Sequence, residues 1–218
     1  VSCWQRPVAL LVLCAGLSPA IVLASVANAP SVGVTNSGQV APGGSGPTAA
    51  ATADGCLVAF ATGSSLTANP NDDSNHLSDI YLRNRCAGFT ERVSVGPRQR
   101  QADGPSTNPA ISDDGCVVGF ESDADNLDDD VADANGRTDV YVRDRCAGVT
   151  ELISVSPLRR AGNRRSFDPV VSHDGCLVAF ISEATDLTRD RPDGSAHLFV
   201  RDRCAGSTRR IAAQWSST

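Results

Sequence analysis

Lysine is missing from this sequence: all 19 of its permanently charged basic residues are arginine, against 25 aspartate and glutamate residues. The formal net charge is −6 at pH 7. Proteins that bind nucleic acids in general carry basic patches that neutralise phosphates. The acidic balance argues against that class, so we expect no nucleic-acid partner.

Motifs of the common enzyme classes are also missing. The chain has no G-x-S-x-G nucleophile elbow, no phosphate-binding P-loop and no H-E-x-x-H zinc helix. Its histidines, His76, His173 and His197, occupy different places in the repeats described below, so they share no catalytic role. These absences predict a protein that is not an enzyme.

No stretch beyond about residue 27 is long and apolar enough to span a membrane. Residues 1–27 are different, because Arg6 is followed by the apolar run Val8–Leu17 and then by small residues. This order is typical of a secretory signal peptide, with cleavage after Ala27. An uncleaved membrane anchor is the main alternative, although Pro19 interrupts the run. Cleavage predicts a secreted or periplasmic protein without a membrane span.

The rest of the chain is built from a repeat. Asp-Gly-Cys begins at Asp54, Asp114 and Asp174, positions that are 60 residues apart, and three tandem copies extend over about 52–95, 108–155 and 168–213. A fixed period indicates a repeat architecture. Residues 28–51 are rich in Gly, Pro and Ser, and we interpret them as a spacer in which the segment at Ser31 could supply an orphan strand.

One copy contains four short runs of β-forming residues. In the central copy, the turn Asp114-Gly115 separates runs at 108–112 and 116–120, and the turn 146–148 separates runs at 139–143 and 150–155. The third run is apolar at consecutive positions, which predicts a strand covered on both faces. Four short antiparallel strands per repeat are the make-up of a propeller blade.

These residues carry a family resemblance. The segments D-G-C-x-V-A-F, D-x-N-G-x-x-D-V-Y-V-R-D and A-G-x-T-E resemble the TolB-like, WD-type β-propeller repeat of secreted bacterial proteins, over residues 31–213. The resemblance implies an all-β fold with three four-stranded antiparallel blades in residues 52–218. It implies binding or scaffolding more often than chemistry. The paired cysteines and the presence of only three copies depart from the family's pattern.

Six cysteines fall two per copy. In each copy the first follows the first turn and the second precedes the last turn, which places both at the same end of a blade. In an oxidising compartment this placement predicts disulfides within the blades. A zinc or redox site lacks the C-x-x-C spacing and the histidines that would complete it. The expected pairs are Cys56 with Cys86, Cys116 with Cys146, and Cys176 with Cys204.

Oxygen-bearing side chains gather in the loop before the third strand. The set comprises Asp133, Asn135 and Asp139 in copy two, with Asp73, Asn75 and Asp79 in copy one. Such oxygens at alternating positions can hold calcium, the only cofactor that the sequence suggests. Asn-Gly with flanking aspartates is also what a tight turn requires, and this alternative stays open. In copy three, Arg191 and His197 replace Asp133 and Asp139, so we expect no site there.

Arginines recur in two settings. An Arg-x-Arg pair ends the third strand of each copy, as in Arg143 and Arg145, and we interpret it as a structural ion pair or an exposed edge, with ligand contact as the alternative. The connections between copies are also rich in arginine, as in Arg164 and Arg165. We interpret these connections as solvated loops, with a site for an anion or an acidic partner as the alternative.

The function predicted from these features is a secreted or periplasmic, non-catalytic β-propeller module that binds or scaffolds a protein or envelope partner. The alternative is an accessory or remnant propeller domain of a hydrolase or peptidase system, because similar propellers precede hydrolase domains in peptidases.

Three copies are too few to close a ring, which uses typically ~4 to 8 blades. The first and last sheets are therefore each expected to have an uncovered apolar face. A homodimer that completes a six-bladed ring would bury both faces. An open monomeric arc, or a chain truncated from a longer gene, is the alternative.

Overall fold

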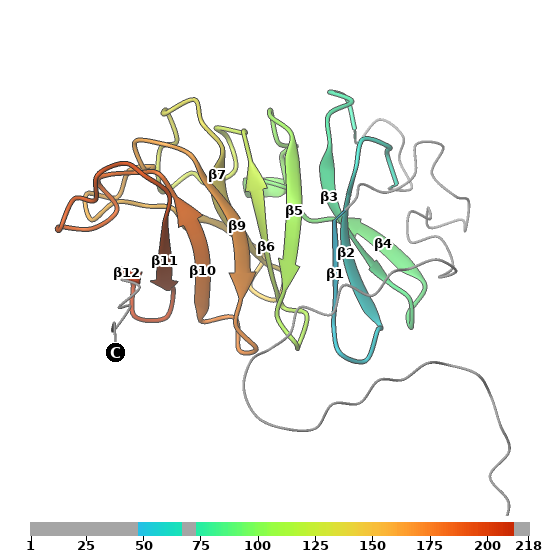
Figure 1. Cartoon of the computed structure of the whole chain (residues 1–218). Helices are drawn as coiled ribbons and strands as arrows, with labels where there is room; N and C mark the ends of the chain where they lie inside the picture. The colour runs from blue at the N-terminus through green and yellow to red at the C-terminus, as the bar shows by residue number, and fades with distance from the viewer. Residues whose placement is uncertain (1–47, 67–72, 212–218) are drawn as a thin grey trace, which may run out of the picture.

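The computed structural model describes residues 48–66 and 73–211, so the predicted signal peptide and most of the predicted spacer lie outside the described part. Within it, three four-stranded antiparallel sheets stand side by side in chain order (Figure 1). The only helical segment among these residues is the short 3-10 turn η2 (Pro97–Gln99). None of the described residues forms a helix long and apolar enough to cross a membrane. The predicted all-β fold of three blades is confirmed.

Each blade is a meander of four consecutive strands. Blade 1 consists of β1 (Ala49–Ala51), β2 (Leu57–Thr62), β3 (Asp79–Asn84) and β4 (Phe89–Arg92). Blade 2 consists of β5 (Ser106–Ile111), β6 (Val117–Ser122), β7 (Asp139–Asp144) and β8 (Val149–Leu152). Blade 3 consists of β9 (Ser166–Val171), β10 (Leu177–Ser182), β11 (His197–Asp202) and β12 (Ser207–Ile211).

The first hairpin turn of each blade explains why Asp-Gly-Cys repeats. In blade 2, the Ser112 hydroxyl donates to Asp114 over 2.6 Å, and Asp114 also accepts the amide of Cys116 over 2.9 Å. These bonds, the first above all, hold the pKa of Asp114 below its usual value. Gly115 has a φ of +71°, a left-handed conformation that glycine adopts readily. The same bonds recur in the other two blades, so this motif is a turn.

Each blade also carries the predicted disulfide. The pairs Cys56–Cys86, Cys116–Cys146 and Cys176–Cys204 have Cα–Cα distances of 5.3, 5.3 and 5.4 Å. They tie the start of the second strand to the end of the third, beside the two short turns. We call this the turn end of a blade, at the bottom in Figure 1, and the opposite end the loop end. Closing a loop of this length contributes about 3 to 4 kcal/mol in the chain-entropy model.

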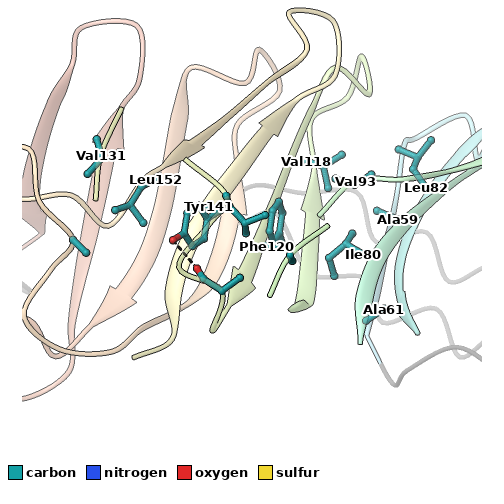
Figure 2. Close-up of a cluster of buried hydrophobic side chains, with 14 of the residues drawn as sticks. Ala59, Ala61, Ile80, Leu82, Val93, Val118, Phe120, Val131, Tyr141 and Leu152 are labelled. Carbon is teal, nitrogen blue, oxygen red and sulfur yellow. Dashed lines mark hydrogen bonds between the residues drawn. The ribbon is translucent and has the colours of Figure 1, made fainter. Parts of the chain in front are cut away.

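Adjoining blades pack face to face through apolar side chains. Between blades 1 and 2, Ile80 and Leu82 share one buried cluster with Phe120 (Figure 2). Between blades 2 and 3, Val142 shares a second cluster with Phe180. Tyr141, the residue before Val142 in β7, belongs to the first cluster. Consecutive residues of this strand therefore face two different neighbours, which confirms the expectation of coverage on both faces for this blade.

An ion pair crosses each of these interfaces near the turn end. The Nε of Arg145 in blade 2 donates to the carboxylate of Glu91 in blade 1 over 2.7 Å, and a second guanidinium nitrogen contacts the same oxygen. Arg203 of blade 3 lies 2.6 Å from Glu151 of blade 2 in the same way. The structural interpretation of the Arg-x-Arg pairs is therefore confirmed for these two arginines.

The two terminal blades differ from one another. Blade 3 exposes an apolar face, as expected: Leu198 is 40% exposed, whereas its counterpart Val140 is 0% exposed. In blade 1, however, Phe60 and Tyr81 are fully buried in a cluster with Leu66. The expectation of an uncovered face is therefore wrong for blade 1, because Leu66 of the β2–β3 loop lies with the aromatic pair that was expected to be bare.

Two element boundaries differ from those expected. β1 begins at Ala49, so blade 1 starts before the boundary placed at residue 52. β8 ends at Leu152 although the apolar pattern continues to residue 155. The amides of Ile153 and Ser154 both donate to the carbonyl of Val140, which ends the regular pairing of successive residues there.

Candidate binding cleft

The first strands of blades 2 and 3, β5 and β9, carry a bulge at the same place. The pairing of β5 with β6 shifts between Thr107 and Ala110, and β9 shifts correspondingly against β10. At the bulges Asn108 and Asp168, 60 residues apart, have φ of +53° and +54°. Asn and Asp tolerate this conformation better than other non-glycine residues. Backbone strain of this kind clusters at functional sites, so the pair is a candidate for part of a binding site.

The two strained residues join a third side chain across the blades. The amide nitrogen of Asn108 donates to Glu121 over 2.7 Å and to Asp168 over 2.9 Å. The backbone amide of Asp168 donates to the same Glu121 oxygen over 2.8 Å. These bonds hold two carboxylates and one amide in fixed positions where blade 2 adjoins blade 3.

This polar group lines a cavity of about 500 Å³ on the side of the first strands. Thr48 also lines it, and Thr48 lies 60 residues before Asn108, so all three blades contribute the equivalent position to one cavity. Phe167 and Arg165 form a further part of the wall.

Arg165 connects this cavity to a larger one. Its guanidinium carbon lies 4.1 Å from the centroid of the Phe167 ring, a cation–π contact that orients the planar group. Arg165 also lines a cleft of about 750 Å³ at the loop end, between blades 2 and 3. We call this the loop-end cleft. It is lined by Asp123, Asp125, Gly136, Arg137, Thr138, Asn163, Arg164, Arg165 and Glu183.

Hydrogen bonds fix several walls of the loop-end cleft. The Thr138 hydroxyl donates to Asp123 over 2.6 Å, and the Asn163 amide donates to Thr185 over 2.8 Å. Arg164 donates to the carbonyl of Gly194 over 3.3 Å. The cleft therefore offers guanidinium donors and carboxylate acceptors on walls that are already held in place.

The predicted calcium residues of blade 2 do come together, in a buried hydrogen-bonded network. Asp133 accepts the hydroxyl of Tyr141 over 2.5 Å. Asp139 accepts the hydroxyl of Ser154 and the amide of Asn135, which also donates to the carbonyl of residue 162 over 2.6 Å. Burial raises the pKa of Asp133 and raises that of Asp139 to about 8. Asp139 is therefore largely protonated at neutral pH.

The equivalent network of blade 1 contains a cation. Arg92 lies 3.3 Å from Asp79, and both side chains are buried, being 8% and 2% exposed. The Gln101 amide donates to Asp73 and to Asn75, both over 2.9 Å. Burial raises the pKa of Asp79, although the hydrogen bond from a serine hydroxyl and the charge of Arg92 lower it.

The asparagines of both networks also stabilise turns, which was the alternative interpretation. Asn75 accepts the amide of Leu77 over 3.0 Å, and Asn135 accepts the amide of Arg137 over 2.6 Å. In residues 48–66 and 73–211, no three His, Cys, Asp or Glu side chains are grouped so that they could hold a metal ion. Calcium binding through the amide and carboxylate oxygens stays a prediction.

Blade 3 places a serine, a histidine and an aspartate together at the loop end. Nε2 of His197 lies 2.9 Å from Asp193 and 3.2 Å from Ser195. In a catalytic triad the serine and the aspartate bind opposite nitrogens of the imidazole. Here both contacts fall on one nitrogen, so the group is not arranged as a triad. Hydrogen bonds from Ser195 hold the pKa of Asp193 well below its usual range.

Comparison with known proteins supports the propeller architecture. No family model and no curated protein matches this sequence. A protein assigned as TolB in Agrobacterium tumefaciens has a similar structure, with a TM-score of 0.50 and 19% identity, over 77% of this chain and 46% of that one. The fold is a TolB-like β-propeller. The chain spans about half the length of that protein.

Other solved structures resemble this TolB-like propeller less closely. TolB from Acinetobacter baumannii has a TM-score of 0.46 and 19% identity, over 77% of this chain and 32% of that one. The β-propeller domain of the Trilobed protease from Pyrococcus furiosus has a TM-score of 0.43 and 15% identity, over 81% and 46% of the two chains. At these identities the comparisons show a fold and no function.

Sequence reasoning missed the strained pair of the TolB-like propeller. Asn108 and Asp168 both precede a proline at the same point of the repeat, and Asn-Pro and Asp-Pro are signals for a turn or a break in a strand. That signal was available. The position of Arg165 at the junction of two cavities had no local signal, because it depends on how blades 2 and 3 are arranged.

Proposed function

We propose that this chain is a non-catalytic, extracytoplasmic binding module that holds a polar segment of a partner protein in the loop-end cleft. The three disulfides support the compartment, because such bonds persist in oxidising surroundings and are rare in the cytosol. The TolB-like propeller supplies rigid blades from which loops project at one end.

The observation that carries the proposal is the junction of two cavities at Arg165. The guanidinium is exposed, is oriented by Phe167, and lines the same cavity as the fixed carboxylates of Glu121 and Asp168. A bound segment would therefore meet a donor and two acceptors at defined positions. Pre-organised groups of this kind lower the cost of binding.

The chemistry of the loop-end cleft favours a polypeptide over a small apolar ligand. Small-molecule pockets are mostly apolar with a few polar groups. This cleft instead carries three arginines and three carboxylates on a surface open to solvent. A polar or charged loop of another protein matches such a lining.

Substitution Arg165→Glu tests the proposal, with Arg160→Glu as the matched control in the same connection. Both arginines are exposed, but only Arg165 lines the cleft. Immobilised wild-type protein is exposed to extracytoplasmic proteins of the producing organism, and the retained proteins are quantified by mass spectrometry. We expect Arg165→Glu to reduce retention of a specific partner by roughly tenfold or more, and Arg160→Glu to leave it unchanged.

Equal retention by both variants would contradict binding in the cleft. The identity of the partner also addresses the second prediction from the sequence, an accessory role in a hydrolase system. A hydrolase retained by wild-type protein and lost with Arg165→Glu would favour that role.

A further inference from the structure

The two interfaces between blades follow one pattern. We call the face of a blade that points toward the next blade its outer face. Each interface joins this outer face to the face of the following blade that carries aromatic side chains. Each is crossed by an ion pair, Arg145 with Glu91 and Arg203 with Glu151. The arginine is oriented in both cases by a bond to the carbonyl of a turn glycine. The pattern gives a template for what an outer face accepts.

The outer face of blade 3 is apolar and exposed. Val170 is 61% exposed and Leu198 40%, and Leu177 and Ile211 are also exposed. Two corresponding positions in blade 2 lie in the interface with blade 3: Val117 and Val140, the counterparts of Leu177 and Leu198, are only 4% and 0% exposed. Contiguous exposed apolar surface of this kind marks an interaction site.

The ion pairs do not continue on this face. Arg209 occupies the position of Glu91 and Glu151: it pairs with Val200 across β11 and β12, as Glu151 pairs with Val142 across β7 and β8. Arg209 is exposed. The side chain that would attract an arginine of a following blade is therefore replaced by one that would repel it.

A second copy of this chain fits the outer face of blade 3 poorly. In a ring of two chains, this face would meet blade 1, whose Arg85 donates to the carbonyl of Gly55 as Arg145 and Arg203 do to their own turn glycines. Arg85 would then lie beside Arg209. The aromatic pair of blade 1, Phe60 and Tyr81, is already fully buried. Charge and burial both argue against the homodimeric ring that the sequence predicts.

We propose that the outer face of blade 3 docks a β-sheet of a different polypeptide, which presents apolar side chains to Val170 and Leu198 and a carboxylate to Arg209. In the internal interfaces the outer face supplies a glutamate and the following blade supplies Arg145 or Arg203. In the proposed interface the outer face supplies Arg209 and the partner supplies the carboxylate. This surface is separate from the loop-end cleft, so the inference goes beyond the proposed function.

Photo-crosslinking from Leu198 tests the inference. A photoreactive residue replaces Leu198 in the full chain, expressed in the producing organism, and crosslinked peptides are identified by mass spectrometry. The control position is Leu158, which is 81% exposed but lies in a connection outside the face. We expect a crosslink to a different protein from position 198, beside an acidic residue, and none from position 158.

Charge variants complete the experiment. Arg209→Glu is expected to reduce the crosslink by roughly tenfold or more, because it places like charges opposite each other. Arg209→Lys keeps most of the crosslink, and Arg160→Glu controls for net charge. Unchanged melting temperatures show that each variant is folded. Crosslinks between two copies of this chain, no crosslink to another protein, or a crosslink insensitive to Arg209→Glu would each overturn the proposal.

Discussion

Blades 1 and 2 bury the same pair of aspartates beside a half-buried asparagine, and they compensate the buried carboxyls differently. In blade 1 the buried Asp79 has Arg92 at 3.3 Å. In blade 2 the position of Arg92 is taken by Leu152, and Asp139 has only neutral donors, Ser154 and Asn135. Burial accordingly raises the pKa of Asp139 to about 8. Blade 1 places a cation beside its buried carboxyl, whereas blade 2 surrounds its buried carboxyl with neutral donors, which favours the protonated form.

The difference shows that a repeated motif does not guarantee a repeated electrostatic state. Asp79 and Asp139 begin equivalent strands and accept the hydroxyls of the equivalent serines. Burial raises the pKa of both carboxyls, and the two differ in residue 92 or 152 of the neighbouring strand, where only Arg92 supplies a charge that lowers the pKa. Substitutions at these positions should therefore give the buried carboxyl of one blade the electrostatic surroundings of the other.

The largest effect is expected from Arg92→Leu, which gives blade 1 the residue of blade 2. Removing one partner of a buried ion pair leaves an uncompensated charge and typically costs about 3 kcal/mol or more. The loss should be larger at pH 8 than at pH 5, because Asp79 without Arg92 takes up a proton more readily. Denaturant unfolding at both pH values measures it.

Arg210→Leu in blade 3 is the matched control. Its ion pair with Asp190 is more exposed, at 29% and 49%. Pairs of this kind contribute about 1 kcal/mol or less. Equal losses for Arg92→Leu and Arg210→Leu would show that blade 1 does not depend on the charge balance described here.

A smaller effect of opposite sign is expected from Asp139→Asn. The unfolded chain releases the proton of this aspartate near pH 4, whereas the folded chain keeps it to about pH 8. The free energy of unfolding of the wild type should therefore fall as the pH rises between these values. Asn cannot ionise, so the variant should lose this dependence and exceed the wild type at pH 8 by roughly 1 to 3 kcal/mol.

Asp79→Asn sharpens the same comparison. In blade 1 the substitution leaves Arg92 buried without its carboxylate, so it should destabilise the protein at pH 8. Unfolding curves from pH 4 to pH 9 for both variants give the signs. A loss of stability at pH 8 in both variants would contradict the proposal that blade 2 holds a neutral Asp139.

The smallest effect concerns calcium. The predicted calcium sites are Asp133, Asn135 and Asp139 in blade 2 and the equivalent set in blade 1, which includes Asp73 and Asp79. If they bind, millimolar calcium should raise the melting temperature by a few degrees through mass action. The rise should be greater at pH 9 than at pH 6, because ligands must be deprotonated. Asp139→Asn should reduce it. An unchanged melting temperature at both pH values would leave these residues with the hydrogen-bonding role alone.

Much of the fold could be predicted because it repeats locally. The hairpin turns at Asp114-Gly115 and their copies, the strand positions, and the disulfide pairs all follow from short-range patterns within one repeat. The side chains of the acidic networks could also be predicted from the sequence, since they lie within a few residues of one another. The bulges at Asn108 and Asp168 were missed although the proline signals were present.

What the sequence by itself determined was the content of each blade, because turn chemistry, apolar runs and cysteine spacing act over fewer residues than one repeat. What only the tertiary structure decided was everything that depends on which blade lies beside which. Arg165 lines two cavities because blade 3 adjoins blade 2, and the pKa of Asp139 is raised because the packed structure buries this carboxyl. Arg209 interrupts the ion pairs where no described blade follows. These are long-range contacts, and the pattern within one repeat does not specify them.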